Sequence, residues 1–160
     1  MNIKKLTKTG LFTALAAALT MFPHFATPTG YVHFGDSIIY IASAFLGPIP
    51  GALVGSVGHS LADIFSGYPI YAAATFIIKG IMGFVIGKIL YKKQTINRLI
   101  LAGIFALFIV TLGYFIAEIP MFGVEAAMVS LISSPVQWLM SVVASAILIP
   151  VINKIIKNIY

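Results

Sequence analysis

Long stretches of this chain contain almost no charged residues, and this feature constrains the possible fold more than any other. Charged residues make up 9% of the 160 residues and hydrophobic residues 60%, and the mean hydropathy is +1.05. A soluble domain has roughly 25% charged residues, because its surface faces water. A small soluble domain could not hide this much apolar surface. The sequence therefore predicts an all-α integral membrane protein.

Proline, glycine and charged residues divide the chain into six apolar segments, to be compared with the roughly 20 residues that cross a bilayer. The predicted spans are Leu6–Phe22, Asp36–Leu46, Pro48–Phe65, Ile70–Leu90, Leu99–Ile119 and Ala126–Ile152. The second is short, so we expect it to begin in the preceding loop or to line a cavity. The segment Pro23–Gly35 is predicted to be an ordered loop. No repeat is visible, and residues 1–160 form one predicted domain.

The charged residues are sorted along these spans. Six spans place both termini on one side, and nine of the ten basic residues fall there: Lys4, Lys5, Lys8, Lys88, Lys92, Lys93, Arg98, Lys154 and Lys157. All four acids, Asp36, Asp63, Glu118 and Glu125, fall at the opposite ends. By the positive-inside rule the basic side is cytoplasmic, so both termini are predicted to be inside. This sorting explains the net charge of +6 without nucleic acid.

Lys79 is the most informative single residue. It lies about ten residues into the fourth span, where an unpaired ammonium costs at least ~2.5 kcal/mol. The cytoplasmic surface is about 15 Å away, whereas a lysine side chain reaches only about 6 Å. We therefore expect Lys79 to face a polar interior, as a ligand-binding or ion-pair residue.

His59 and Asp63 are four residues apart and so share one face of the third span. The pair is a weak metal site, because such a site needs three or four ligands and the spacing supplies no third. A hydrogen-bonded pair, or Asp63 as the counterion of Lys79, is the favoured interpretation. The chain has no cysteine, and we predict no metal or cofactor.

The last two spans carry polar residues at helical spacing. In the sixth span these are Ser130, Ser134, Gln137, Ser141 and Ser145, and in the fifth they are Tyr114 and Glu118. Two interpretations remain open for them. In the first, these side chains form hydrogen bonds between helices. In the second, the polar residues in the outer half of the membrane contact a substrate.

Small residues repeat every four positions in three spans, which allows helices to approach closely. Gly51 and Gly55, and Gly83 and Gly87, are expected to pack inside the bundle. Ala14 and Ala18 either do the same or face a partner protein. The chain has no phosphate-binding loop, zinc-protease motif or serine elbow, so transport driven by ATP would require separate subunits.

The stretch Gly30–Gly87 resembles a known family. Its F-G-D (Phe34–Asp36), L-A-D-I-F-S-G-Y-P (Leu61–Pro69) and I-I-K-G (Ile77–Gly80) motifs are similar to those of S components of energy-coupling factor (ECF) vitamin transporters of the riboflavin type. The resemblance implies a six-helix, substrate-binding subunit of the cell membrane, whose outward-facing vitamin site is capped by the loop between the first two spans. It also implies that Ala14 and Ala18 contact a transmembrane coupling subunit, which works with two cytoplasmic ATPases.

The predicted substrate-binding residues are His33, Asp36, Tyr40, His59, Asp63, Lys79, Glu118 and Gln137. Several flavin and thiamin binders have asparagine in the outer half of their helices, and this chain has none there. A smaller aromatic vitamin or precursor, such as pyridoxine or hydroxymethylpyrimidine, therefore suits the site better than riboflavin, which remains a second candidate. Two further classes of protein stay open. One is an intramembrane enzyme that uses His59, Asp63 and Glu118, and the second is a secondary transporter, for which no internal inverted repeat is evident.

Overall fold

The computed structural model describes residues 1–26 and 31–159, most of which are helical. The helices are α1 (Ile3–Met21), α2 (Asp36–Leu46), α3 (Pro48–Leu53), α4 (His59–Phe65), α5 (Ala72–Leu90), α6 (Ile96–Phe122), α7 (Val124–Ala127) and α8 (Ser130–Ile159). A π-helical turn, η1 (Val54–Gly58), joins α3 to α4, and a 3-10 turn, η2 (Pro69–Tyr71), precedes α5. The all-α prediction is confirmed for the helical bundle, to which one short hairpin is added.

Local sequence signals set several helix boundaries. The side chain of Asn2 accepts a hydrogen bond of 2.9 Å from the Lys5 amide and so caps the start of α1. Helix α3 begins with Pro48, which suits a first helical turn. Gly47 separates α2 from α3, and Gly123 separates α6 from α7. Their φ angles of 97° and 87° are strained for residues with a side chain.

Each of the six predicted spans corresponds to a helical segment, with two differences. The third is one continuous rod from Pro48 to Phe65 that contains the π-helical turn, and the sixth is interrupted between α7 and α8. Three stretches of the described chain are long and apolar enough to cross a membrane: Pro69–Leu90, Ile96–Phe122 and Val124–Lys157. The full count of six crossings stays a prediction.

The segment predicted to be an ordered loop contains a β-hairpin. Strand β1 (His24–Ala26) pairs antiparallel with β2 (Tyr31–His33), with His24 opposite His33. The remaining loop residues 27–30 lie outside the described residues. The hairpin follows α1 directly and leads into α2, so it ties the ends of these two helices together.

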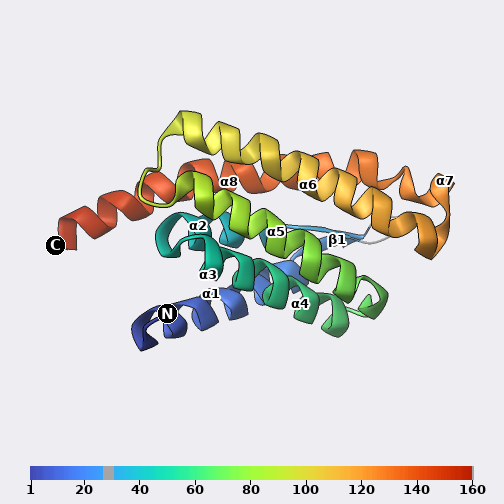
Figure 1. Ribbon diagram of the computed structural model, residues 1–160, viewed down its shortest axis with the longest axis horizontal. Helices are drawn as coiled ribbons and strands as arrows, with labels where there is room; N and C mark the ends of the chain where they lie inside the picture. The colour runs from blue at the N-terminus through green and yellow to red at the C-terminus, as the bar shows by residue number, and fades with distance from the viewer. Residues whose placement is uncertain (27–30, 160) are drawn as a thin grey trace.

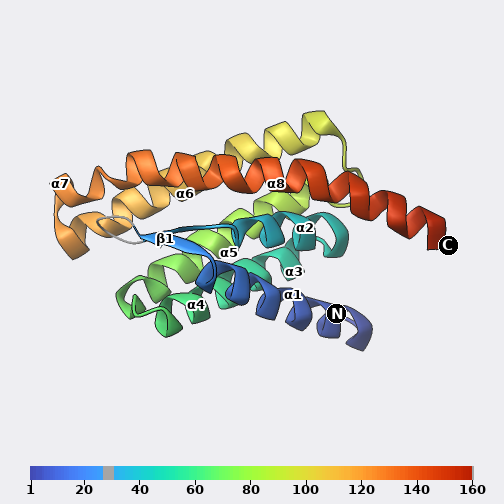
Figure 2. The ribbon, with the colours of Figure 1, turned by 180° about the vertical axis from the view of Figure 1, so that it is seen from behind.

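Helix α5 lies at the centre of the bundle. Figures 1 and 2 show α6 and α8 side by side along one side of it, and α1 with α3 and α4 along the other. The predicted packing of small residues is confirmed here. A Cβ atom on Gly83 would lie 2.2 Å from the Gly51 carbonyl oxygen, and one on Gly55 would lie 2.2 Å from that of Lys79. These glycines let the backbones of the Pro48–Phe65 rod and α5 touch.

The two chain ends and the turn between α5 and α6 lie at the same end of the molecule (Figure 1). The predicted cytoplasmic lysines belong to these elements, whereas α7 and the turn between α4 and η2 lie at the other end. The outer faces of α6 and α8 expose apolar side chains such as Ile100, Leu112, Ile132 and Ile147. This distribution suits a bundle surrounded by lipid.

Candidate substrate-binding site

A cavity of about 500 Å³, its open mouth included, lies between the hairpin and helices α4, α5, α6 and α8. Most of its wall is polar or aromatic. The lining residues are Tyr31, Val32, His33, Asp63, Tyr71, Thr75, Val110, Tyr114, Glu118, Ser130, Ser133, Ser134 and Gln137.

Glu118 forms one wall of the cavity, near the end of α6. Its carboxyl group accepts hydrogen bonds from the Tyr71 hydroxyl, at 2.9 Å, and from the Ser130 hydroxyl. The side chain is 3% exposed, and a buried carboxylate requires such donors. The bonds connect α6 to η2 and to the start of α8.

Asp63 lies beneath the hairpin, near the end of α4. Its Oδ1 atom accepts a 2.7 Å hydrogen bond from the hydroxyl of Tyr31 on β2. Burial, and next the adjacent Asp63, raises the pKa of Tyr31, so this hydroxyl keeps its proton and donates. The Tyr31 ring also lies 4.9 Å from that of Tyr68, between centroids. The hairpin is thus fixed over the cavity by both a hydrogen bond and ring contact.

Behind the cavity, three polar side chains from three other helical segments converge on Asp36, in the first turn of α2. The Nζ atom of Lys79 donates to Asp36 Oδ2 at 2.7 Å, and the Nε2 atom of Gln137 donates to the same oxygen at 3.0 Å. His59 Nε2 lies 3.1 Å from Asp36 Oδ1. Lys79 is fully buried, as its position in the span predicts, and its charge is neutralised by Asp36.

This arrangement corrects the pairing expected from sequence. His59 and Asp63 do not bond to each other, and the counterion of Lys79 is Asp36 rather than Asp63. The spacing of His59 and Asp63 put them on one face, but Asp36 reaches that level from another helix. The junction before it fits closely, because a Cβ on Gly35 would lie 2.0 Å from the Thr20 hydroxyl of α1. Glycine in the F-G-D motif is what lets Asp36 approach.

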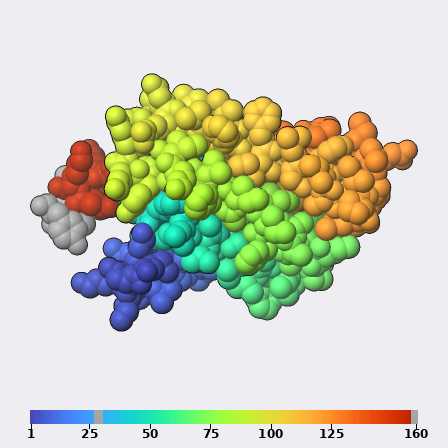
Figure 3. Space-filling view, viewed as in Figure 1, coloured from blue at the N-terminus to red at the C-terminus, as the bar shows by residue number. Residues whose placement is uncertain are grey.

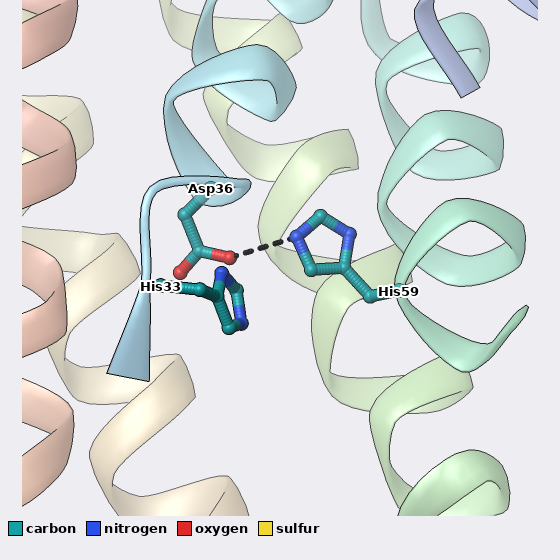
Figure 4. Close-up of side chains that lie close together, drawn as sticks. All are labelled: His33, Asp36 and His59. Carbon is teal, nitrogen blue, oxygen red and sulfur yellow. Dashed lines mark ion pairs between the residues drawn. The ribbon is translucent and has the colours of Figure 1, made fainter. Parts of the chain in front are cut away.

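His33, Asp36 and His59 form the one cluster among the described residues that offers three potential metal ligands (Figure 4). Their candidate ligand atoms lie within 4.8 Å of one another, and two imidazoles with a carboxylate are a common zinc set. The Lys79 ammonium already pairs with Asp36, however, and would repel a second cation. The geometry therefore favours an ion-pair network over a metal centre.

His33 connects this network to the hairpin. Its Nδ1 atom accepts a 3.1 Å hydrogen bond from the Gly35 amide, so the proton of the neutral ring is on Nε2. Burial is the largest influence on the group and lowers the pKa of His33, although Asp36 opposes it. The ring is accordingly neutral in the folded protein.

The structure divides the eight predicted site residues into two groups. His33, Asp63, Glu118 and Gln137 line the cavity, whereas Asp36, Tyr40, His59 and Lys79 are buried and lie outside its lining. Gln137 belongs to both the cavity wall and the Asp36 network. Whether any of the eight contacts a substrate stays a prediction.

Sequence reasoning did not single out Tyr31, Tyr71 or Ser133 as lining residues. Tyr71 follows Pro69 in a short turn, and Tyr31 lies in the hairpin, so helical spacing could not place either one. One signal in the sequence could have pointed to Tyr31 and Tyr71. Both tyrosines fall in the predicted outer half, at the same level as Asp63 and Glu118.

A polar cavity inside an apolar helical bundle is typical of a membrane protein that binds a solute. Residues 1–157 match the family model described as "ECF-type riboflavin transporter, S component". The chain therefore belongs to this family.

Similar proteins support this assignment. The chain is 30% identical over 158 residues to the thiamine precursor transporter HmpT of Lactococcus lactis, which covers 96% of this chain and 90% of HmpT. It is 34% identical to an uncharacterized protein of Pyrococcus woesei over 110 residues, 68% of this chain and 72% of that protein. The structure of FolT bound with folic acid superposes with a TM-score of 0.78 at 19% identity, covering 92% of this chain and 93% of FolT. This last match shows that the chain shares the fold of FolT.

Proposed function

We propose that this chain is the substrate-binding subunit of an ECF importer that captures a small aromatic vitamin or vitamin precursor, of the pyridoxine or hydroxymethylpyrimidine type. The main observation in support is the cavity beneath the hairpin, where three tyrosines and two carboxyl groups surround a space suited to a compact ring. The similarity to HmpT over nearly the whole chain supports a thiamine precursor as the first candidate.

The proposed import also requires partners. A transmembrane coupling subunit and two cytoplasmic ATPases would supply the energy in the cell membrane, and the chain itself performs no catalysis. Ala14 and Ala18 are both exposed on α1, which lies at the edge of the molecule (Figure 3). They are the proposed contact with the coupling subunit.

Riboflavin is the second candidate substrate, because the matching family model is described by that vitamin. Mass spectrometry of small molecules that co-purify with the detergent-solubilised protein distinguishes the two. A pyrimidine or pyridine alcohol is the expected result, whereas a bound flavin would replace the first candidate with the second. The proposed function would be contradicted if no aromatic molecule co-purifies and if the protein also fails to bind added hydroxymethylpyrimidine, pyridoxine and riboflavin.

A further inference from the structure

Most hydroxyl protons around the cavity are already engaged within the protein. Tyr71 and Ser130 donate to Glu118, and Tyr31 donates to Asp63. Ser133 donates to the Val129 carbonyl at 3.2 Å. A hydroxyl that has donated its proton can still accept. The cavity therefore offers a ligand many lone pairs and few protons.

The side-chain amide of Gln137 also presents an acceptor, rather than a donor, to the cavity. An ionised carboxylate only accepts hydrogen bonds, so the group that Gln137 directs at Asp36 has to be its NH2. The Lys79 ammonium keeps Asp36 ionised by binding the same oxygen. The carbonyl oxygen of Gln137 is then the end left for the cavity. Lys79 and Asp36 thus act as positioning residues for an acceptor.

The cavity also lacks positive charge. Its lining, within the part of the chain that the structure describes, contains two acids and neither lysine nor arginine. Asp63 Oδ2 is buried without a well-formed hydrogen bond among the described residues. The Thr75 hydroxyl, which interacts with the Asp63 carboxylate, also pairs with the Tyr114 hydroxyl at 3.1 Å. A buried acceptor without a donor is costly, so an incoming donor would be favoured here.

We infer that the cavity selects an aromatic heterocycle that carries an amino group and is neutral or cationic, and that it rejects phosphate esters and carboxylates of the same ring. This inference rests on the proposed function and narrows its substrate class. Glu118 and Asp63 accept from the amino group, and the tyrosine rings enclose the heterocycle. An anionic substituent would meet carboxylates in a low-dielectric site, where like charges repel strongly.

Binding to the purified protein in lipid nanodiscs tests the inference by isothermal titration calorimetry. The probes are an aminopyrimidine that carries a hydroxymethyl group, the same ring with an oxo group in place of the amino group, and the phosphate ester of the first. We expect the aminopyrimidine to bind at least about 10-fold more tightly than either of the remaining probes, because each of them leaves an acceptor unpaired or adds a like charge.

Two variants locate the selectivity. Glu118→Gln replaces an acceptor by a group that also donates, so we expect the preference for the amino over the oxo ring to fall about 10-fold or more. Glu125→Gln is the matched control, because Glu125 is exposed and outside the cavity lining. The Glu125→Gln variant should prefer the amino over the oxo ring to the same extent as the unmodified protein. The ratio of the two affinities is the readout, since a general loss of folding would lower both.

Equal or tighter binding of the oxo ring or of the phosphate ester would overturn the inference. Binding of pyridoxine or riboflavin without binding of the aminopyrimidine would also overturn it, while leaving the proposed function in place. If the protein binds none of these molecules, the proposed function fails and the inference fails with it.

Discussion

Asp36 shows how one side chain can organise several helices. It receives Lys79 from α5, Gln137 from α8 and His59 from α4. A buried charge is costly unless it is paired and hydrogen-bonded, so each partner is needed to keep the carboxylate ionised in an apolar bundle. The network therefore determines how these helices pack around the cavity.

Removing Lys79 should affect folding as well as binding. We expect Lys79→Met to destabilise the protein by about 3–5 kcal/mol, because it leaves Asp36 as an unpaired buried charge. The double variant Asp36→Asn with Lys79→Met should recover part of that loss. Thermal unfolding in detergent measures both. A single variant as stable as the unmodified protein would show that Asp36 does not depend on this pair.

His33 should make stability depend on pH. Its pKa is lowered in the folded protein, mainly by burial, while the unfolded chain protonates near its usual value of 6.5. The unfolded state therefore binds more protons, so stability is fully present above about pH 6.5 and falls below it, by at most about 1.4 kcal/mol per pH unit.

The measurement is the unfolding temperature between pH 7.5 and pH 5. His33→Gln keeps a polar side chain without the titrating ring, and we expect it to flatten the decline. An equally steep decline in the variant would assign the pH dependence to another group.

At the scale of helices and strands, the hydrophobic segments of the sequence predicted where helices lie. The spacing of polar residues did not predict which helices they contact. The bounds of α2 and of the rod from Pro48 to Phe65 agree with the sequence, since proline and glycine punctuate them. The hairpin was not predicted, because its short strands lack a pattern that separates them from a loop. Nor could spacing within one helix show that Asp36 lies opposite Lys79, since that contact depends on how two helices cross.

Helix α1 offers an accessible face for a partner. Gly10, Ala14 and Ala18 are all exposed at intervals of four residues, and a Cβ on Gly10 would meet nothing within 4 Å. We expect Ala14→Trp to leave substrate affinity unchanged and to abolish transport, because a bulky ring prevents close helix contact.

The assays are calorimetry on the purified variant and uptake of labelled substrate by cells. Leu112→Trp, on the exposed apolar face of α6, is the matched control and should transport normally. Loss of substrate binding in Ala14→Trp would instead place this face in the interior of the bundle.

At the scale of the whole molecule, the predicted orientation can be tested directly. The chain contains no cysteine, so single cysteines can report their side of the membrane. We expect a membrane-impermeant maleimide to label Glu125→Cys in intact cells, but Lys4→Cys and Lys154→Cys only after permeabilisation, as the positive-inside rule requires. Labelling of just one terminus in intact cells would contradict an even number of crossings.

The basic end of the molecule has a further consequence if it faces the cytoplasm. Anionic lipids of that leaflet attract each nearby lysine or arginine by roughly 1 kcal/mol, and nine such residues belong to this end. Any reorientation of the subunit in the bilayer would have to separate some of them from the headgroups. Transport should therefore slow as the anionic lipid content of the membrane rises.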